Sequence, residues 1–168
     1  MKKSARPVNW ALAILIIAGV IAGAYYLFSS QIPASNIYFL KGEKLVAVKR
    51  ALPQDADPLQ VAALELMSGP NEPEAKEGIF SEIPKKAKIT KVEKQGETAN
   101  VIFNDEIENY GGGSARVQGL VAQIVYTFTD IPGIKRVKIF VGNRASVVLG
   151  GEGFVIDKPL SRQDLETR

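Results

Sequence analysis

The sequence contains no cysteine and no histidine among its 168 residues. Without them the chain offers no disulfide, no thiolate nucleophile, no zinc site of cysteine and histidine, and no catalytic triad with an imidazole base. It also has neither the Gly-Lys-Ser/Thr of a Walker loop nor the glycine fingerprint of a dinucleotide site. We therefore predict no catalytic residue, no cofactor and no metal, and expect that the protein is not an enzyme.

A net excess of positive charge is also missing from most of the chain. The net charge is +3, and Lys2, Lys3 and Arg6, which lie in a segment without acids, account for all of it. The other 18 basic residues balance 18 acidic ones. Since nucleic-acid binding usually requires a clustered basic excess, we expect no nucleic-acid partner.

Residues 10–28 form a stretch of nineteen residues without a charge. At about 1.5 Å rise per residue, a helix of this length nearly matches a bilayer core of about 30 Å. We predict a transmembrane helix there, with residues 1–9 as a cytoplasmic tail because basic residues tend to stay inside. Everything after Phe28 would then be extracytoplasmic.

An alternative for the same stretch is a cleaved signal peptide, because Ala22-Gly23-Ala24 has the small residues of a cleavage site. Against cleavage, the apolar run continues past Ala24, and Tyr25 and Tyr26 suit an interfacial aromatic belt. Because the sequence has no cysteine to carry a lipid, we expect no lipoprotein anchor.

After a predicted linker at residues 29–35, turn residues and alternation predict strands and one helix. The helix has Asp57 as N-cap and Pro58 as first residue, and should end at Gly69-Pro70. Residues 71–86, rich in Pro, Glu, Lys and Gly, are expected to form a long ordered loop. Two hairpins are predicted, from strands at 36–40 with 45–50 and at 88–93 with 98–103.

The stretch 111–141 carries the clearest signals. A triple glycine and a capping Ser114 precede a helix predicted to run to Thr129. One buried helical face is predicted from Val117, Leu120, Val121, Ile124, Val125 and Phe128. Further strands are predicted at 137–141, with Arg136 and Lys138 on the outward side, at 145–149 and at 154–156. The polar C-terminal end is expected to fray, with 163–168 as a tail.

Together these elements predict an α/β (α+β) fold, with two helices packed on one face of a mixed or antiparallel sheet, plus the N-terminal transmembrane helix. The segments NIYFL, LELMSGP, Ile83-Pro84, VIFND and DKPLSR, and above all residues 111–141, resemble the GerMN domain family, named for sporulation and spore germination. The resemblance covers residues 36–162.

The resemblance implies a compact domain without known catalytic activity, exported at the bacterial envelope and connected with the assembly of envelope complexes during sporulation. It offers no catalytic residues to carry over. This chain has one copy, behind a predicted transmembrane anchor in place of a lipidated cysteine.

Two neighbouring features could bind a ligand. Gly111, Gly112, Gly113 and Ser114 precede a helix whose backbone N–H groups could hold an anion, although a flexible approach with a serine cap explains them as well. Asp105 and Glu106, with Asn104 and Glu108, could bind Ca²⁺ or orient a ligand, or form a solvated loop. Paired carboxylates also permit glycoside hydrolysis in principle, but no substrate cleft is marked.

Partner contacts are predicted from two other features. Phe140 should lie on the outward side of its strand, where an aromatic side chain could contact a partner unless another layer covers it. The basic run from Lys85 to Lys94 could meet anionic lipid or wall polymer, or be a solvated strand face.

We therefore expect a membrane-anchored extracytoplasmic GerMN-like domain that acts as a non-enzymatic interaction or assembly module of the cell envelope. Its expected partners are the membrane and either envelope proteins or a second copy of itself. The alternative is a domain that binds wall glycan or a small anion at the 105–114 turn. The sequence leaves any small-molecule ligand open.

Overall fold

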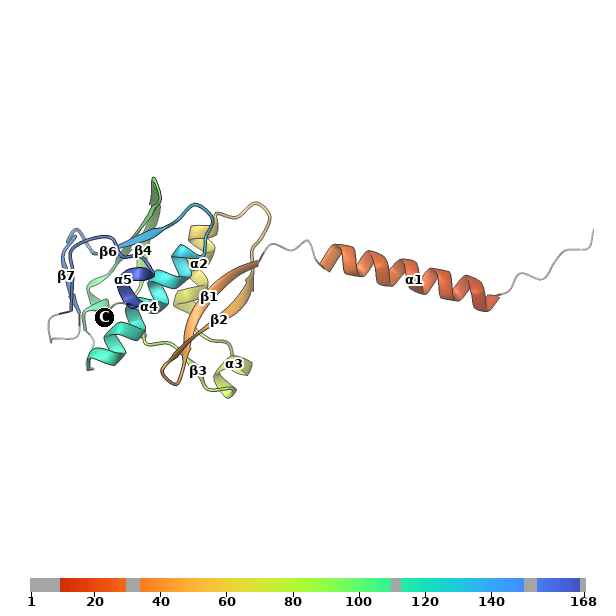
Figure 1. Cartoon of the computed structure of the whole chain (residues 1–168), viewed down its shortest axis with the longest axis horizontal. Helices are drawn as coiled ribbons and strands as arrows, with labels where there is room; N and C mark the ends of the chain where they lie inside the picture. Colours follow the sequence, from red (N-terminus) through yellow and green to blue (C-terminus); the bar gives the residue numbers. More distant parts are fainter. Residues whose placement is uncertain (1–9, 30–33, 110–112, 150–153, 167–168) are drawn as a thin grey trace, which may run out of the picture. The chain divides into compact units, whose positions relative to one another are not determined.

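The computed structural model describes residues 10–29, 34–109, 113–149 and 154–166 (Figure 1). The chain divides into two compact units, Met1–Pro33 and Ala34–Arg168. The described part of the first unit contains helix α1 (Trp10–Ser29), and the second unit contains the strands and the other helices.

Helix α1 lies where the sequence predicted a helix, and no proline interrupts its leucines, isoleucines and alanines. The apolar side chains of Ile14, Leu15, Ile16 and Ile17 are between 59% and 72% exposed. Over the residues that the structure describes, no helix is both long and apolar enough to cross a membrane. The transmembrane interpretation of α1 thus gains no support from the structure and stays a prediction.

The second unit begins with the first predicted hairpin, formed by β1 (Ala34–Lys41) and β2 (Lys44–Ala51). The strands pair antiparallel without a shift, and Gly42 in the two-residue turn has a φ of 60°, which glycine adopts without strain. On the other edge of β1, the short strand β3 (Ile79–Phe80) pairs with the end of β1.

Helix α2 (Pro58–Ser68) begins as predicted, since the Asp57 side chain accepts a hydrogen bond from the N–H of Leu59 at 2.9 Å. The long loop predicted at 71–86 is wrong in part, because it contains α3 (Glu72–Lys76) and β3. Asn71 and Glu74 form a capping box that starts α3. The capping box is visible in the sequence, but the proline and glycine content of residues 71–86 favoured a loop.

The second sheet contains the other predicted hairpin, β4 (Ile89–Gln95) and β5 (Thr98–Phe103), and then β6 (Arg136–Val141). Strands β5 and β6 are parallel, so the chain must cross over between them. The crossover passes through a short 3₁₀ helix, η1 (Asp105–Ile107), and through α4 (Ser114–Thr129), the helix predicted from the glycine turn.

Helix α4 buries the predicted apolar face, and α2 and α4 each contact strands of both three-stranded sheets (Figure 1). Phe39, Leu66, Phe103 and Phe128 lie in one continuous core between these elements. The mixed α+β class is confirmed, but the single sheet is wrong. The described strands form sheets β2-β1-β3 and β4-β5-β6 and a pair of β7 (Val147–Leu149) and β8 (Phe154–Ile156). The first sheet ends there because β3 and α4 occupy the β1 edge that would have continued it.

The strands predicted at 145–149 and 154–156 are confirmed, and the chain after them is more ordered than predicted. Strands β7 (Val147–Leu149) and β8 (Phe154–Ile156) pair antiparallel, and Leu160 then forms a two-way backbone bridge with Val137 of β6. The predicted frayed end is wrong for the described residues, because it contains α5 (Gln163–Glu166) and because Arg162 binds to α4.

The same segment changes the outward side of β6. Lys138 was predicted to face solvent, but its side chain is buried and its ammonium donates to the carbonyl oxygen of Asp157. A lysine on the outward side of a strand is usually solvated. Lys138 is buried because the C-terminal chain returns across β6, and the sequence pattern of β6 contains no sign of that.

Candidate functional site

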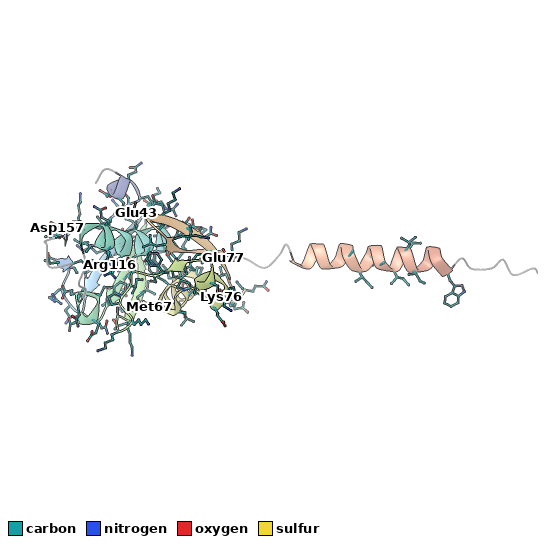
Figure 2. All side chains as sticks on the ribbon, turned by 90° about the horizontal axis from the view of Figure 1, so that it is seen from below. Glu43, Met67, Lys76, Glu77, Arg116 and Asp157 are labelled. Atoms are coloured by element: carbon teal, nitrogen blue, oxygen red, sulfur yellow. The ribbon has the colours of Figure 1, made fainter. Side chains whose placement is uncertain are left out.

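A groove of about 550 Å³ lies between the turn of the β1–β2 hairpin and the first turns of α4. We call it the hairpin groove, and Figure 2 labels two of its residues, Glu43 and Arg116. Its lining residues are Leu40, Gly42, Glu43, Leu45, Glu82, Ala115, Arg116, Gln118, Gly119, Ala122 and Leu165. Three segments that are distant in sequence therefore meet here: the hairpin, the chain after β3, and the start of α4, with α5 closing one side.

The hairpin and α4 approach each other closely because position 119 has no side chain. A Cβ atom built at Gly119 would stand 2.8 Å from Cδ1 of Leu40, closer than real Cβ contacts. Glycine within a helix costs up to about 1 kcal/mol relative to alanine. At position 119 this loss of helix stability accompanies a close contact between β1 and α4 at the edge of the groove.

Two of the lining residues, Arg116 and Glu82, form an ion pair. Nε and Nη2 of Arg116 both donate to one carboxylate oxygen of Glu82, at 3.0 and 2.9 Å. The side chain of Glu82 is only 11% exposed, while that of Arg116 is 54% exposed. The side-chain oxygen of Gln123 also accepts a hydrogen bond from the backbone N–H of Glu82 at 2.7 Å. This bond holds the backbone that positions the Glu82 carboxylate.

The groove thus has an apolar floor of Leu40, Leu45, Ala122 and Leu165, and a polar mouth. Such a surface can bury an apolar side chain and hydrogen-bond to the groups beside it. Sequence reasoning missed Glu82 and Arg116, because they are 34 residues apart and only the fold brings them together.

The acidic residues of the predicted ligand turn are bound to an arginine. Arg144, just after β6, donates to Asp105 at 3.0 Å and to both carboxylate oxygens of Glu108, at 2.9 and 2.6 Å. These contacts raise the pKa of Arg144, with Glu108 as the main cause and Asp105 as the second. Glu106 instead accepts from the side chain of Asn109 at 3.4 Å.

The carboxylates of Asp105 and Glu108 are therefore paired with Arg144, a residue that the sequence did not mark as part of this site. In the described part of the chain, no three acidic side chains converge as a metal site would require. Asp105 is exposed, and Glu106 is half-buried.

The glycine turn is described only in part. Gly111 and Gly112 lie outside the described residues, and Gly113 is the N-cap of α4 in an extended conformation. The prediction that Ser114 caps the helix is wrong, since Ser114 is the first helical residue and α4 has no side-chain cap hydrogen bond. A serine before a hydrophobic stripe is compatible with the N-cap and with the first helical position. The predicted start of the helix was therefore off by one residue.

Phe140 lies on β6, opposite Ile102 of β5. Its ring is half-buried, and the ammonium of Lys138 stands 5.9 Å from the ring centroid. A partner contact through Phe140 therefore stays a prediction.

A family model described as "Germane: Sporulation and spore germination" matches residues 36–146. The first GerMN domain of the sporulation protein GerM from Bacillus subtilis is similar in structure, with a TM-score of 0.63 and 21% identity over 79% of this chain and 99% of that chain. No curated protein matches the chain.

Two further solved structures share the fold. A putative lipoprotein from Clostridium perfringens has a TM-score of 0.57 and 24% identity, over 79% of this chain and 89% of that one. The tandem GerMN domains of GerM from Bacillus subtilis have a TM-score of 0.57 and 19% identity, over 78% of this chain and 45% of that one. The resemblance noted from the sequence is therefore confirmed.

Proposed function

The chain belongs to the Germane (GerMN) family of sporulation and spore germination, and from this premise we propose that it is a non-enzymatic interaction module of the bacterial cell envelope. Its partner would be another envelope protein or a second copy of the chain. One of the similar structures is the first GerMN domain of a sporulation protein, which supports a role in the same process.

The hairpin groove is the observation that carries this proposal. It is formed within the family-matching residues apart from Leu165, and it joins an apolar floor to a charged mouth fixed by Arg116 and Glu82. Docking of a partner side chain would remove the apolar floor from water, which is the main favourable contribution to protein association.

The proposal includes a membrane anchor. It rests on the charge-free residues 10–28 and on the basic residues before them. The similar structure titled as a putative lipoprotein supports a membrane-associated extracytoplasmic domain. The second unit would then lie outside the cytoplasm, behind the predicted linker.

Site-specific crosslinking in the cells that encode the protein tests the groove. A photoreactive benzoyl-phenylalanine replaces Gln118 in the groove, and, as a control, Gln54 at the opposite end of the β1–β2 hairpin. We expect a discrete crosslinked species from position 118 only, and its loss in Ala122→Phe, which fills the floor. The same species from both positions, or its persistence in Ala122→Phe, would count against docking in this groove.

Topology is tested separately. Protease added to intact spheroplasts should digest the second unit, and N-terminal sequencing of the membrane-bound chain should find residues 1–24 still attached. An intact second unit would exclude the extracytoplasmic placement. A mature chain that begins at Tyr25 would instead show cleavage after Ala24.

A second candidate function is the binding of wall glycan or a small anion at the 105–114 turn. The observation in its favour is the start of α4, where no side-chain cap satisfies the first N–H groups of the helix. Addition of muropeptide or phosphate should then shift the amide signals of Gly113 and Ser114. Unchanged signals at millimolar ligand would remove this candidate.

A further inference from the structure

A second groove, of about 420 Å³, lies between α2 and β4. We call it the lysine groove, and it shares no lining residue with the hairpin groove. Met67, one of its residues, is labelled in Figure 2 and lies well apart from Glu43 in that view. The lining residues are Gln60, Ala63, Leu64, Met67, Lys85, Ala87, Lys88, Ile89, Thr90, Lys91 and Val92.

The apolar part of the lysine groove is centred on Leu64. Its side chain is 67% exposed, the largest value for a large hydrophobic residue described in the second unit. The buried face of α2 contains Leu59, Ala62, Ala63 and Leu66, so Leu64 lies beside that face rather than in it. Ala63 and Met67 line the groove beside Leu64, so together they give it an apolar wall.

Basic residues surround this apolar centre. Lys85, Lys88 and Lys91 line the groove, and Lys86 lies next to them in the chain. Lys91 pairs with Glu93 at 2.7 Å, whereas within the described part of the chain Lys85 and Lys88 form no ion pair. The rim therefore has positive charge that is not neutralised within the described structure.

We propose that the lysine groove binds an acidic segment of a partner protein, which inserts an apolar side chain against Leu64 and Met67 and pairs its carboxylates with Lys85 and Lys88. The complementary charge selects the partner, and the apolar contact gives affinity. A wall polymer offers negative charge without an apolar side chain. A bilayer surface is flat and cannot enter a concave groove between a helix and a strand.

This site is independent of the proposed function, because it needs neither the membrane anchor nor the hairpin groove. The test uses the full chain in non-ionic detergent, with methyl NMR signals of Leu64 and Met67 as the readout. The probe is a synthetic peptide of glutamate, alanine and leucine, with the leucines at helical spacing. The same peptide with lysine in place of glutamate is the charge control.

We expect the glutamate peptide to shift both methyl signals with saturation at submillimolar concentration, and the lysine peptide to leave them unchanged. The double substitution Lys85→Glu/Lys88→Glu should weaken binding about tenfold or more, because two favourable charge pairs become repulsive. The matched control Lys44→Glu/Lys49→Glu, which makes the same charge change on β2, should bind like the unaltered chain. Leu64→Gln should weaken binding without lowering thermal stability.

Three outcomes would overturn the proposal. The signals could remain unchanged at millimolar glutamate peptide, or the two peptides could bind equally. Alternatively, mixed micelles containing phosphatidylglycerol could shift the same methyl signals when the peptide does not, which would make the groove a contact for anionic lipid.

Discussion

The hydroxyl oxygen of Thr127 on α4 accepts a hydrogen bond from the backbone N–H of Tyr38 on β1 at 3.0 Å, across 89 residues of sequence. Gln123, one turn earlier in α4, approaches the carbonyl oxygen of the same tyrosine at 3.5 Å. Both side chains are 0% exposed. Side chains of α4 thus form hydrogen bonds with backbone groups on a part of the β1 edge that no described strand pairs with. These bonds hold the first sheet against the helix.

Thr127→Val should lower the free energy of unfolding by about 1–3 kcal/mol, because valine keeps the shape and leaves the N–H of Tyr38 buried without an acceptor. Urea unfolding measures the loss, and amide exchange at Tyr38 locates it. Thr127→Ser is the control, since it keeps the hydroxyl and should keep Tyr38 protected. Equal protection of Tyr38 in the valine variant would show that the bond does not hold this edge.

This pair also shows what the sequence could and could not predict. Helix and strand positions follow from local signals, such as the Asp57 cap, the Gly42 turn and the apolar stripe of α4, and those predictions are confirmed. Gln123 and Thr127 are polar and lie beside the stripe, so their burial depends on a strand that comes 85 to 89 residues earlier. Local periodicity contains no information about that strand.

The same reason explains why the sequence marked the acids of the 105–114 turn but not the arginine that binds them. Asp105 and Glu106 could be noticed as acids at a strand end, but Arg144, which binds Asp105, arrives there only through the parallel pairing of β5 and β6. Both grooves likewise join residues from distant segments. The sequence marked the basic run from Lys85 to Lys94, but only the fold places it beside Leu64 and Met67 of α2.

Acid should weaken the contact between β2 and α3. Arg50 binds both carboxylate oxygens of Glu74, at 2.6 and 2.7 Å, and the side chains are only 13% and 17% exposed. The hydrogen bond from Arg50 is the main cause that lowers the pKa of Glu74 below its ordinary 4.5. A lowered folded pKa means that the stabilisation is complete above the unfolded value and is lost as the pH falls through the folded one.

Glu74→Gln should therefore cost about 1–2 kcal/mol at neutral pH, and this difference should shrink as the pH falls from about 6 to about 3. Glutamine is compatible with the capping box of α3, so the substitution isolates the ion pair. Glu72→Gln is the matched control, because its pair with Lys76 is highly exposed and should contribute at most about 0.5 kcal/mol. A difference that stays constant with pH in urea unfolding would contradict the assignment.

Arg162 should hold the C-terminal chain on α4. Its guanidinium donates to Thr129 at 2.8 Å, and to the carbonyl oxygen of Tyr126 and to Asp130 at 3.1 Å each. It also stands 4.7 Å from the Tyr126 ring centroid. Arg162→Lys loses the planar geometry that makes these contacts together, and should destabilise by about 1–2 kcal/mol.

Hydrogen exchange should show where that loss occurs. The N–H of Leu160, which donates to Val137 at 2.8 Å, should exchange faster in Arg162→Lys, while amides of the β1–β2 hairpin change little. Arg136→Lys, an exposed arginine on β6, is the control and should leave Leu160 protected. If Leu160 keeps its protection in Arg162→Lys, the backbone bridge alone holds this segment.

Gly119→Ala tests whether the hairpin groove has room to adjust. Alanine favours the helix by up to about 1 kcal/mol, but its Cβ would meet Cδ1 of Leu40 at 2.8 Å. That atom is the end of a side chain that lines the groove, so it can rotate into the open volume. We expect a change in unfolding free energy within about 0.5 kcal/mol, together with shifted methyl signals of Leu40.

Gly119→Val adds two further carbons at the same contact and restricts the helix at χ1, so it should cost about 1–3 kcal/mol. If alanine proves as costly as valine, Leu40 has no space to move and the groove is rigid at this point. If alanine is neutral, the displaced Leu40 side chain narrows the floor of the groove, and crosslinking from position 118 should fall while the fold remains intact. One substitution would then reduce partner contact without changing the free energy of unfolding. That result is expected if the groove serves docking and is not needed for folding.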